Sequence, residues 1–292
     1  MTRHPLWWGV WLLLGLAMLA VVAPWLAPYD PNASLDLIGL KSQPPSWAHP
    51  FGTDPYSRDV LSRVLYGTRV SVSFALLAVS IVVVIGTAYG TAMAFAPPLV
   101  ATLLRRTLDL LIAVPRLLVL LAVAGVAGPL AMPSLVLLTA GTGWYACARL
   151  VHDDLMALRT REFTIAARAT GVPVVRLVSH HLLPHVTPTL MTLATLAVAG
   201  TIGLEAGLSF LGLGIQPPTA SWGNIIRDGA GLVSTQWWLT VFPSLAMLLP
   251  VLACNAAGDA LRDRFASTHF GGSVPPAGSL PAPMRSPHVL RS

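Results

Sequence analysis

Charged side chains are scarce in this sequence. Asp, Glu, Lys and Arg make up 10% of its 292 residues, whereas 54% of the residues are hydrophobic. Soluble globular domains carry about 25% charged residues, so the composition excludes a water-soluble domain. Several apolar stretches reach the roughly 20 residues that an α-helix needs to cross a bilayer. The sequence therefore predicts an all-α, polytopic membrane protein.

Cysteine is almost absent, and the common motifs of catalysis are missing. Cys147 and Cys254 lie in apolar stretches, where they are typical packing residues. His181 and His185 are four residues apart, but no acidic or cysteine ligand lies nearby in sequence. The chain has no GxxxxGKS or GxxxxGKT phosphate-binding loop, no HExxH and no GxSxG pattern. We therefore expect a non-catalytic chain with no metal site and no cofactor of its own, which cannot itself hydrolyse ATP.

Six apolar stretches are long enough to be membrane-spanning helices. They cover about residues 6–26, 70–96, 103–127, 130–148, 188–213 and 237–260. Only Gly128 and Pro129 separate the third from the fourth, which predicts a helical hairpin. The first is longer than the apolar core of about 7–15 residues in a signal peptide and lacks a clear cleavage site, so we interpret it as a span.

Basic residues are distributed unevenly between the two sides of these spans. With the N-terminus inside, twelve lie in inner segments, namely Arg3, Arg105, Arg106, Arg149, Arg159, Arg161, Arg168, Arg176, Arg262, Arg264, Arg285 and Arg291. Five lie in outer segments, namely Lys41, Arg58, Arg63, Arg69 and Arg227. Because positive charge collects in cytoplasmic loops, both termini are predicted to be cytoplasmic. The same rule accounts for the net charge of +6 without a nucleic-acid partner.

Three regions follow from this topology. Residues 1–69 hold the first span and a long outer loop, 27–69, whose aromatic and turn-forming residues favour an ordered structure. Residues 70–265 form a five-helix core, with a second outer loop over 214–236. Residues 266–292 are rich in Pro, Gly and Ser and are expected to be a disordered cytoplasmic tail, because they cannot bury enough apolar surface to fold.

The longest inner segment, residues 149–187, has the pattern of two short helices. Apolar residues at i, i+4 and i+7 predict a helix that continues to Gly171, a typical C-terminal stop. Pro173 suits the first turn of a second helix, whose end is disrupted by Pro184. Such a pair fits either a groove in a partner protein or the membrane surface, and periodicity alone does not decide between them.

Part of this segment resembles the EAA motif of ABC-importer inner-membrane subunits: Glu-Ala-Ala, three residues, Gly, nine residues, Ile, one residue, Leu-Pro. The matching positions are Ala166, Ala167, Gly171, Leu183 and Pro184. Ile165 stands where the motif has glutamate, and His181 where it has isoleucine. The resemblance implies a coupling helix around residues 160–185 that sits in a cleft of an ATPase subunit. Glu162, one helical turn before Ile165, is predicted to supply the missing acidic contact, the alternative being a solvated surface charge.

Three further stretches resemble one group of these subunits, the C-type permeases for dipeptides, oligopeptides and nickel. They are HPFGTDPYSRDVLSRVLYGTRVS, EAGLSFLGLGIQPPTASWGNII and WWLTVFPSLAMLLPVLACNAAGDALRD. The likeness covers about residues 20–265, with Ser57 where the family usually has glycine. It implies the type I ABC importer permease fold in the lipid of a bacterial cytoplasmic (inner) membrane. The implied partners are a second homologous permease, two cytoplasmic ATPase domains that bind ATP and Mg, and an extracytoplasmic solute-binding protein.

Peptides are the substrate that this resemblance favours, and nickel or another small solute is the alternative. A remote alternative is an ion-coupled secondary transporter, but the sequence lacks the internal duplication usual in that class.

Ionisable residues in or near the spans are candidates for the translocation route. Such groups are costly in hydrocarbon and usually face a bundle interior or a water-filled path. We predict that Arg116 and Glu205 line or gate this route, with Asp109 on the helix face of Arg116. The alternative is structural pairing that locks the helices together.

Small residues mark one face of the fifth span, at Gly200, Gly203 and Gly207. They permit another helix to approach closely. In the family this helix borders the pore and the second permease, and packing within one subunit is the alternative.

Overall fold

The computed structural model describes Gly15, Met18 and residues 20–270, and this part of the chain is built from helices and loops. A short helical segment ends at Leu26. The helices that follow are α2 (Val60–Phe95), α3 (Pro98–Ala113), α4 (Arg116–Ala127), α5 (Met132–Gly141), α6 (Tyr145–Arg159), α7 (Glu162–Ala169), α8 (Val174–Arg176), the π-helical turn η1 (Leu177–Leu182), α9 (Leu183–Phe210), α10 (Trp222–Gly229) and α11 (Trp238–Phe270).

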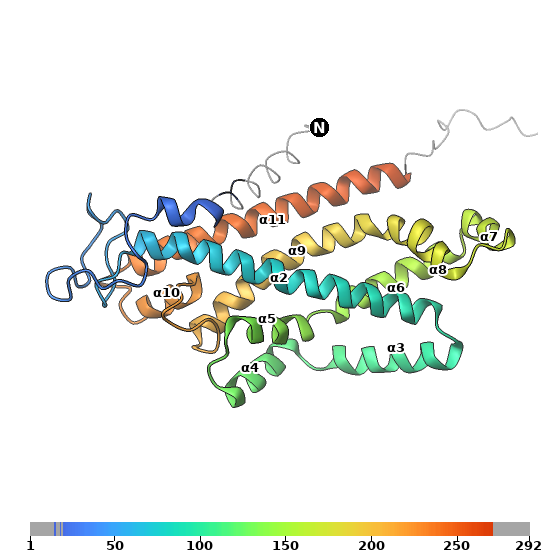
Figure 1. Cartoon of the computed structure of the whole chain (residues 1–292), viewed down its shortest axis with the longest axis horizontal. Helices are drawn as coiled ribbons and strands as arrows, with labels where there is room; N and C mark the ends of the chain where they lie inside the picture. Colours follow the sequence, from blue (N-terminus) through green and yellow to red (C-terminus); the bar gives the residue numbers. More distant parts are fainter. Residues whose placement is uncertain (1–14, 16–17, 19, 271–292) are drawn as a thin grey trace, which may run out of the picture.

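Three helices are long and apolar enough to cross a membrane. They are α2, the combined α8, η1 and α9 over Val174–Phe210, and α11 over Trp238–Asp263. They run along the long axis of the molecule, with α9 packed against both α2 and α11 (Figure 1). The first predicted span, residues 6–26, lies mostly outside the described residues. The count of six spans and the side of the termini therefore stay predictions.

Two predicted spans are each broken into two helices. α3 and α4 are bent by 74° at Val114–Pro115, and α5 and α6 are bent by 42° at residues 142–144. Pro115 has no backbone donor and disfavours the helical conformation at Val114, which has a ψ of 123°. The prediction of single helices over 103–127 and 130–148 is therefore wrong. With each bent pair counted as one span, the described residues contain up to five.

α2 and α6 cross closely because α2 carries glycine where they meet. A Cβ atom on Gly86 would lie 2.6 Å from the Cβ of Cys147, and one on Gly90 would lie 2.9 Å from the Cβ of Val151. Cys147 and Val151 are themselves buried in an apolar core shared with η1 and α9. Lipid is as apolar as these side chains, so close packing of this kind is what holds membrane helices together.

Both ends of the predicted core differ from the structure. α2 begins at Val60, so residues 60–69 of the predicted outer loop are helical. Hydropathy missed this start because Ser62 and Arg63 lie in the first turn, where both are buried among polar groups. At the other end, α11 continues to Phe270, beyond the predicted boundary at residue 265. The rest of the predicted tail, residues 271–292, lies outside the described residues.

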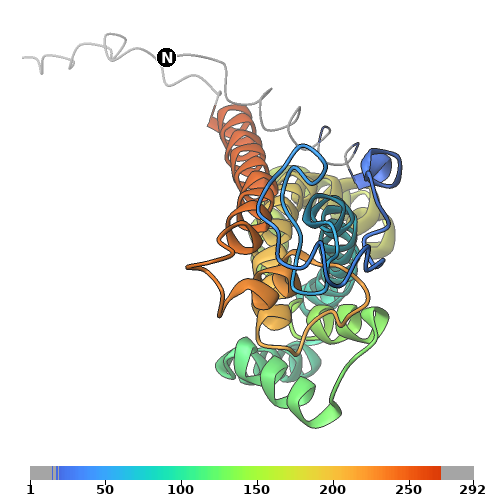
Figure 2. The ribbon, with the colours of Figure 1, turned by 90° about the vertical axis from the view of Figure 1, so that its left-hand side faces the viewer.

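The two outer loops pack over one end of the bundle, opposite the end that carries α7 and α8 (Figures 1 and 2). Trp238 Nε1 donates a hydrogen bond to the Thr53 carbonyl at 3.1 Å, and Trp222 Nε1 donates to the Val64 carbonyl at 3.2 Å. Gly52 has a φ of 74°, and a Cβ there would lie 2.9 Å from Trp238 Nε1. The prediction of ordered, packed loops is confirmed for the described residues.

Candidate functional site

The predicted coupling segment forms a compact projection at one end of the molecule, which we call the α7 tip and define as residues 160–176. The predicted helix from residue 149 to Gly171 is broken, because α6 ends at Arg159 and α7 begins at Glu162. The stop at Gly171 is confirmed: its φ is 78°. Gly171 N–H donates to the Arg168 carbonyl at 3.0 Å, and Val172 N–H donates to the Ala167 carbonyl at 3.2 Å. These two bonds form a Schellman motif.

α7 turns one face inward and the other outward. Thr164 is buried, and its Oγ1 donates to the Leu158 carbonyl at 2.8 Å. Ala167, one turn further on, packs against the apolar core. The opposite face presents four exposed residues, namely Glu162, Ile165, Ala166 and Ala169. Glu162 and Ile165 are thus neighbours on the exposed face.

Leu183 and Pro184, the last two positions of the motif, lie where α9 begins. The predicted disruption at Pro184 is wrong, because the helical path continues from Val174 to Phe210. The turn before it is π-helical, with Leu183 N–H donating to the Val178 carbonyl five residues earlier. A π turn and a proline at the same place are a common way of bending a helix without ending it. Leu182, next to them, is fully buried.

Asp109 lies in a polar cavity between α3 and α6. Its carboxylate pairs with Arg149 of α6, and both side chains are about half exposed. The cavity has a volume of about 290 Å³ and is also lined by Arg105 and His152, whose Nη2 and Nε2 atoms are 3.4 Å apart. Asp109 therefore has an ionic partner on a neighbouring helix.

Arg116 links the break between α3 and α4 to the break between α5 and α6 through its side-chain hydrogen bonds. It is the first residue of α4, and its Nη2 donates to the Thr139 carbonyl of α5 at 2.9 Å, while Nε lies 3.5 Å from Thr142 Oγ1. The acceptors are at the C-terminal end of α5, where the helix dipole favours a cation. Gly143 leaves room for the guanidinium, since a Cβ there would lie 2.8 Å from Nη2.

Glu205 is fully buried in α9, with 0% of its surface exposed. Its carboxylate accepts hydrogen bonds from Ser71 Oγ of α2 at 2.8 Å and from Ser209 Oγ at 2.7 Å. Ser209 Oγ in turn accepts from Ile215 N–H at 2.9 Å, which ties in the following loop. Among the described residues, Glu205, Arg116 and Asp109 each have separate partners and do not form one site. Their assignment to the translocation route stays a prediction.

The glycine face of α9 is open in this chain. A Cβ atom on Gly200, Gly203 or Gly207 would meet no other atom within 4 Å. Close packing of this face within the subunit is therefore not found among the described residues. Glu205 lies on the other side of the same helix.

Sequence reasoning missed a buried charge cluster at the end of the bundle opposite the α7 tip. Asp54 Oδ2 accepts from Arg58 Nε at 2.6 Å and from Arg63 Nη1 at 3.1 Å. Arg58 Nη2 also donates to Asp228 of α10 at 3.1 Å, which links the two outer loops. Burial raises the pKa of the Asp228 carboxyl, while the charges of Arg58 and Arg227 act in the opposite direction. The signal in the sequence was the alternation of Asp and Arg in TDPYSRDVLSR. The prediction from hydropathy and charge counted these arginines only as basic residues of a loop.

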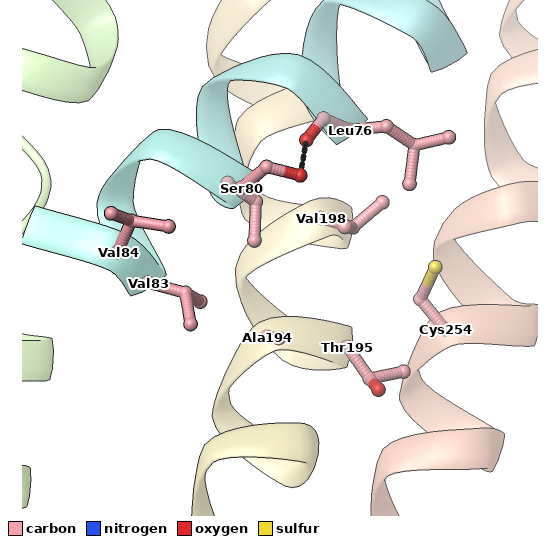
Figure 3. Close-up of a pocket in the computed structure, with 9 residues that line it drawn as sticks. Leu76, Ser80, Val83, Val84, Ala194, Thr195, Val198 and Cys254 are labelled. Carbon is pink, nitrogen blue, oxygen red and sulfur yellow. Dashed lines mark hydrogen bonds between the residues drawn. The ribbon is translucent and has the colours of Figure 1, made fainter. Parts of the chain in front are cut away.

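A large apolar cavity lies between α2, α9 and α11 (Figure 3). It has a volume of about 530 Å³ and is lined by residues such as Leu76, Val83 and Val198. Its two hydroxyl groups are already committed to the backbone, since Ser80 Oγ donates to the Leu76 carbonyl and Thr195 Oγ1 to the Met191 carbonyl, both at 2.8 Å. Apart from these hydroxyl groups and the Cys254 thiol, the residues that line the cavity are apolar, which suits an apolar rather than a polar solute.

A bundle of long apolar helices with a short amphipathic helix exposed at one end defines a polytopic membrane protein. Residues 85–268 match the family model described as binding-protein-dependent transport system inner membrane component. Residues 3–45 match a model described as the N-terminal transmembrane domain of oligopeptide transport permease C. The chain belongs to this family of transport permeases and is a multi-pass protein of the inner membrane.

Curated relatives align over most of their length. A Brucella suis biovar 1 protein, provisionally named a peptide transport system permease, is 37% identical over 255 residues, which are 87% of this chain and 85% of that protein. The di/tripeptide transport system permease DppC of Pseudomonas aeruginosa strain UCBPP-PA14 is 35% identical over 261 residues, with coverage of 87% and 85%.

The fold is similar to that of the MetNI methionine ABC transporter in an inward-facing form. The match has a TM-score of 0.57 and 18% sequence identity, and it covers 70% of this chain and 97% of the other. At this identity the likeness supports the permease fold alone.

Proposed function

We propose that this chain is the C-type permease subunit of an ABC importer that moves di- or oligopeptides into the cell. The observation that carries the substrate class is the agreement between the names of its relatives and the match to the permease C model. The chain supplies the path through the membrane and takes no part in the chemistry. Two partner ATPase domains bind Mg and ATP and hydrolyse the ATP. A second homologous permease and an extracytoplasmic solute-binding protein complete the importer.

The α7 tip is the proposed contact with the ATPases. Its exposed face carries Glu162 and Ile165 beside the small side chains of Ala166 and Ala169, which permit close approach of another surface. Within the tip, Gly171 and its Schellman turn connect α7 to the long helix Val174–Phe210. A movement of the ATPases is therefore applied directly to a helix that reaches the outer end, which is how a ligand biases two states of the bundle.

The open glycine face of α9 is the proposed contact with the second permease. A Cβ on Gly200, Gly203 or Gly207 would meet nothing within 4 Å in the described part of the subunit, and small residues are typical of interfaces between membrane helices. With six spans and both termini in the cytoplasm, the α7 tip lies inside and the charge cluster of Asp54 and Arg58 lies outside, facing the solute-binding protein.

The decisive experiment is uptake by the whole importer in proteoliposomes. The complex is purified from its host with its co-purifying ATPases and binding protein. We expect ATP-dependent uptake of a labelled dipeptide or oligopeptide in preference to radioactive nickel. Uptake of nickel alone would move the substrate to the alternative class. Uptake driven by an ion gradient without ATPases would contradict the proposal.

Glu162 provides a matched test of the coupling contact. We expect Glu162→Gln to lower peptide-stimulated ATP hydrolysis because it removes the acidic group on the exposed face of α7. Unchanged hydrolysis and assembly would mean that Glu162 is only a solvated surface charge.

A further inference from the structure

The α7 tip carries positive charge without a paired carboxylate in the part of the chain that the structure describes. Arg161, Arg168 and Arg176 are all exposed, and none is within 4 Å of a carboxylate oxygen among the described residues. Glu162 is the one acidic residue between positions 160 and 176. In contrast, Arg58 and Arg63 at the outer end both have acidic partners. The charge of the tip is thus available to an outside partner.

The α7 tip also exposes several large apolar side chains. Ile165 is 58% exposed, Val174 is 53% exposed and Val175 is 80% exposed. Phe163 stacks on His185 on one side, with ring centroids 5.1 Å apart, and is 39% exposed on the other. The tip therefore exposes both large apolar side chains and arginines.

Position 165 decides the polarity of this surface. The EAA pattern places a carboxylate there, on the exposed face of α7, whereas this chain has an isoleucine. A carboxylate at the centre of the tip would require a positive partner group, since a buried charge without a partner is costly. An isoleucine at the same position is instead matched by an apolar surface.

A protein surface fits this tip better than a lipid surface. α7 lies beyond the ends of α2 and α3 along the axis of the bundle (Figure 1), so this part of the tip extends past the neighbouring long helices. In addition, Ala166 and Ala169 beside Ile165 give a short ridge with small flanks, a shape that suits a groove.

We infer that the α7 tip binds a groove of its partner that is apolar where it meets Ile165 and is rimmed by acidic residues where it meets the arginines of the tip. This inference rests on the proposed function, because it takes the ATPase subunit as the partner. Ile165 fills the groove, and Arg161, Arg168 and Arg176 meet the acidic rim. The cognate ATPase is recognised by this pattern of charge.

The sharpest test restores the motif residue. In nanodiscs without anionic lipid, the affinity of the permease pair for its co-purified ATPases is measured by fluorescence titration. We expect Ile165→Glu to weaken binding by about thirtyfold or more, as for the centre of an interface, and Ile165→Leu to leave it within about threefold. Equal or tighter binding with Ile165→Glu would overturn the inference.

Charge reversal tests the rim. Reversal of each arginine to glutamate is expected to weaken binding by about fivefold and to flatten its dependence on salt, because exposed pairs of charges are screened. Arg106→Glu is the matched control, since Arg106 is exposed on α3 and away from the tip. If the tip reversals leave ATPase binding unchanged and only reduce binding to phosphatidylglycerol vesicles, the partner is lipid and the inference fails.

Failure of the two proposals is distinguishable. If the wild-type permease binds no ATPase at all, the proposed function is wrong. If it binds an ATPase but the tip reversals behave like Arg106→Glu, the proposed function stands and only the acidic rim is wrong.

Discussion

Ser57 has a backbone conformation that suits glycine better than serine. Its φ is 59°, its side chain is fully buried, and its Oγ has no hydrogen-bond partner among the described residues. We expect Ser57→Gly to stabilise the protein by about 1 kcal/mol, because it relieves the strain of a Cβ at positive φ and removes an unpaired hydroxyl. The midpoint of thermal unfolding in detergent measures this. Ser57→Ala keeps the Cβ, so an equal gain from that variant would assign the effect to the hydroxyl alone.

Asp54 is the centre of the outer charge cluster. Its carboxylate accepts from Arg58 and Arg63 and also from two backbone N–H groups, those of Tyr56 and Arg58, at 2.9 Å each. Asp54→Ala leaves two buried guanidinium groups without this partner, and we expect a loss of about 3–5 kcal/mol in stability. Asp30→Ala is the control, because Asp30 is an exposed residue of the same loop. Similar unfolding midpoints for the two variants would contradict this.

At the scale of elements, Arg116 ties α4 to the break between α5 and α6. Gly143→Ala would place a methyl group 2.8 Å from Arg116 Nη2, and we expect it to displace the guanidinium and cost about 1–3 kcal/mol, the penalty of an unpaired buried group. Gly141→Ala is the control, since a Cβ there meets nothing within 4 Å. The two unfolding midpoints are compared in detergent. If Gly143→Ala is as mild as Gly141→Ala, the tether contributes nothing.

Sequence reasoning found the positions of the elements better than their internal breaks. The length of each apolar stretch located α2, α9 and α11, and the glycine–proline spacing located the turn at Gly171. The bend at Pro115 was overlooked because the apolar run continues with Leu and Val on both sides of it. Hydropathy measures side-chain polarity and carries no information on backbone conformation. The π turn at Leu177–Leu182 has no side-chain signature. It depends on how Leu177 and Leu182 are buried against other elements, which a single sequence does not reveal.

At the scale of the whole molecule, a substitution on the open face of α9 is expected to change assembly with the second permease without changing the stability of the subunit. We expect Gly203→Leu to leave the stability of the isolated subunit within about 0.5 kcal/mol of wild type, because a Cβ at this position meets no atom within 4 Å among the described residues. The same variant should lose the second permease during co-purification. Gly86→Leu is the contrasting variant, since Gly86 faces Cys147 and the subunit itself should fail to pack. Normal assembly of Gly203→Leu would place the partner on another face.

The π turn between the α7 tip and α9 also fixes an angle. It holds one residue more than an α-helical path with the same hydrogen bonds would need, and each residue of an α-helix corresponds to a rotation of about 100°. The orientation of the α7 tip about the helix axis is therefore fixed relative to the orientations of Glu205 and of the glycine face of α9. A single residue added or removed between Arg176 and Leu183 would rotate the α7 tip relative to α9 about the helix axis. The contacts along α9 would still form, but the exposed face of the tip would point in a different direction.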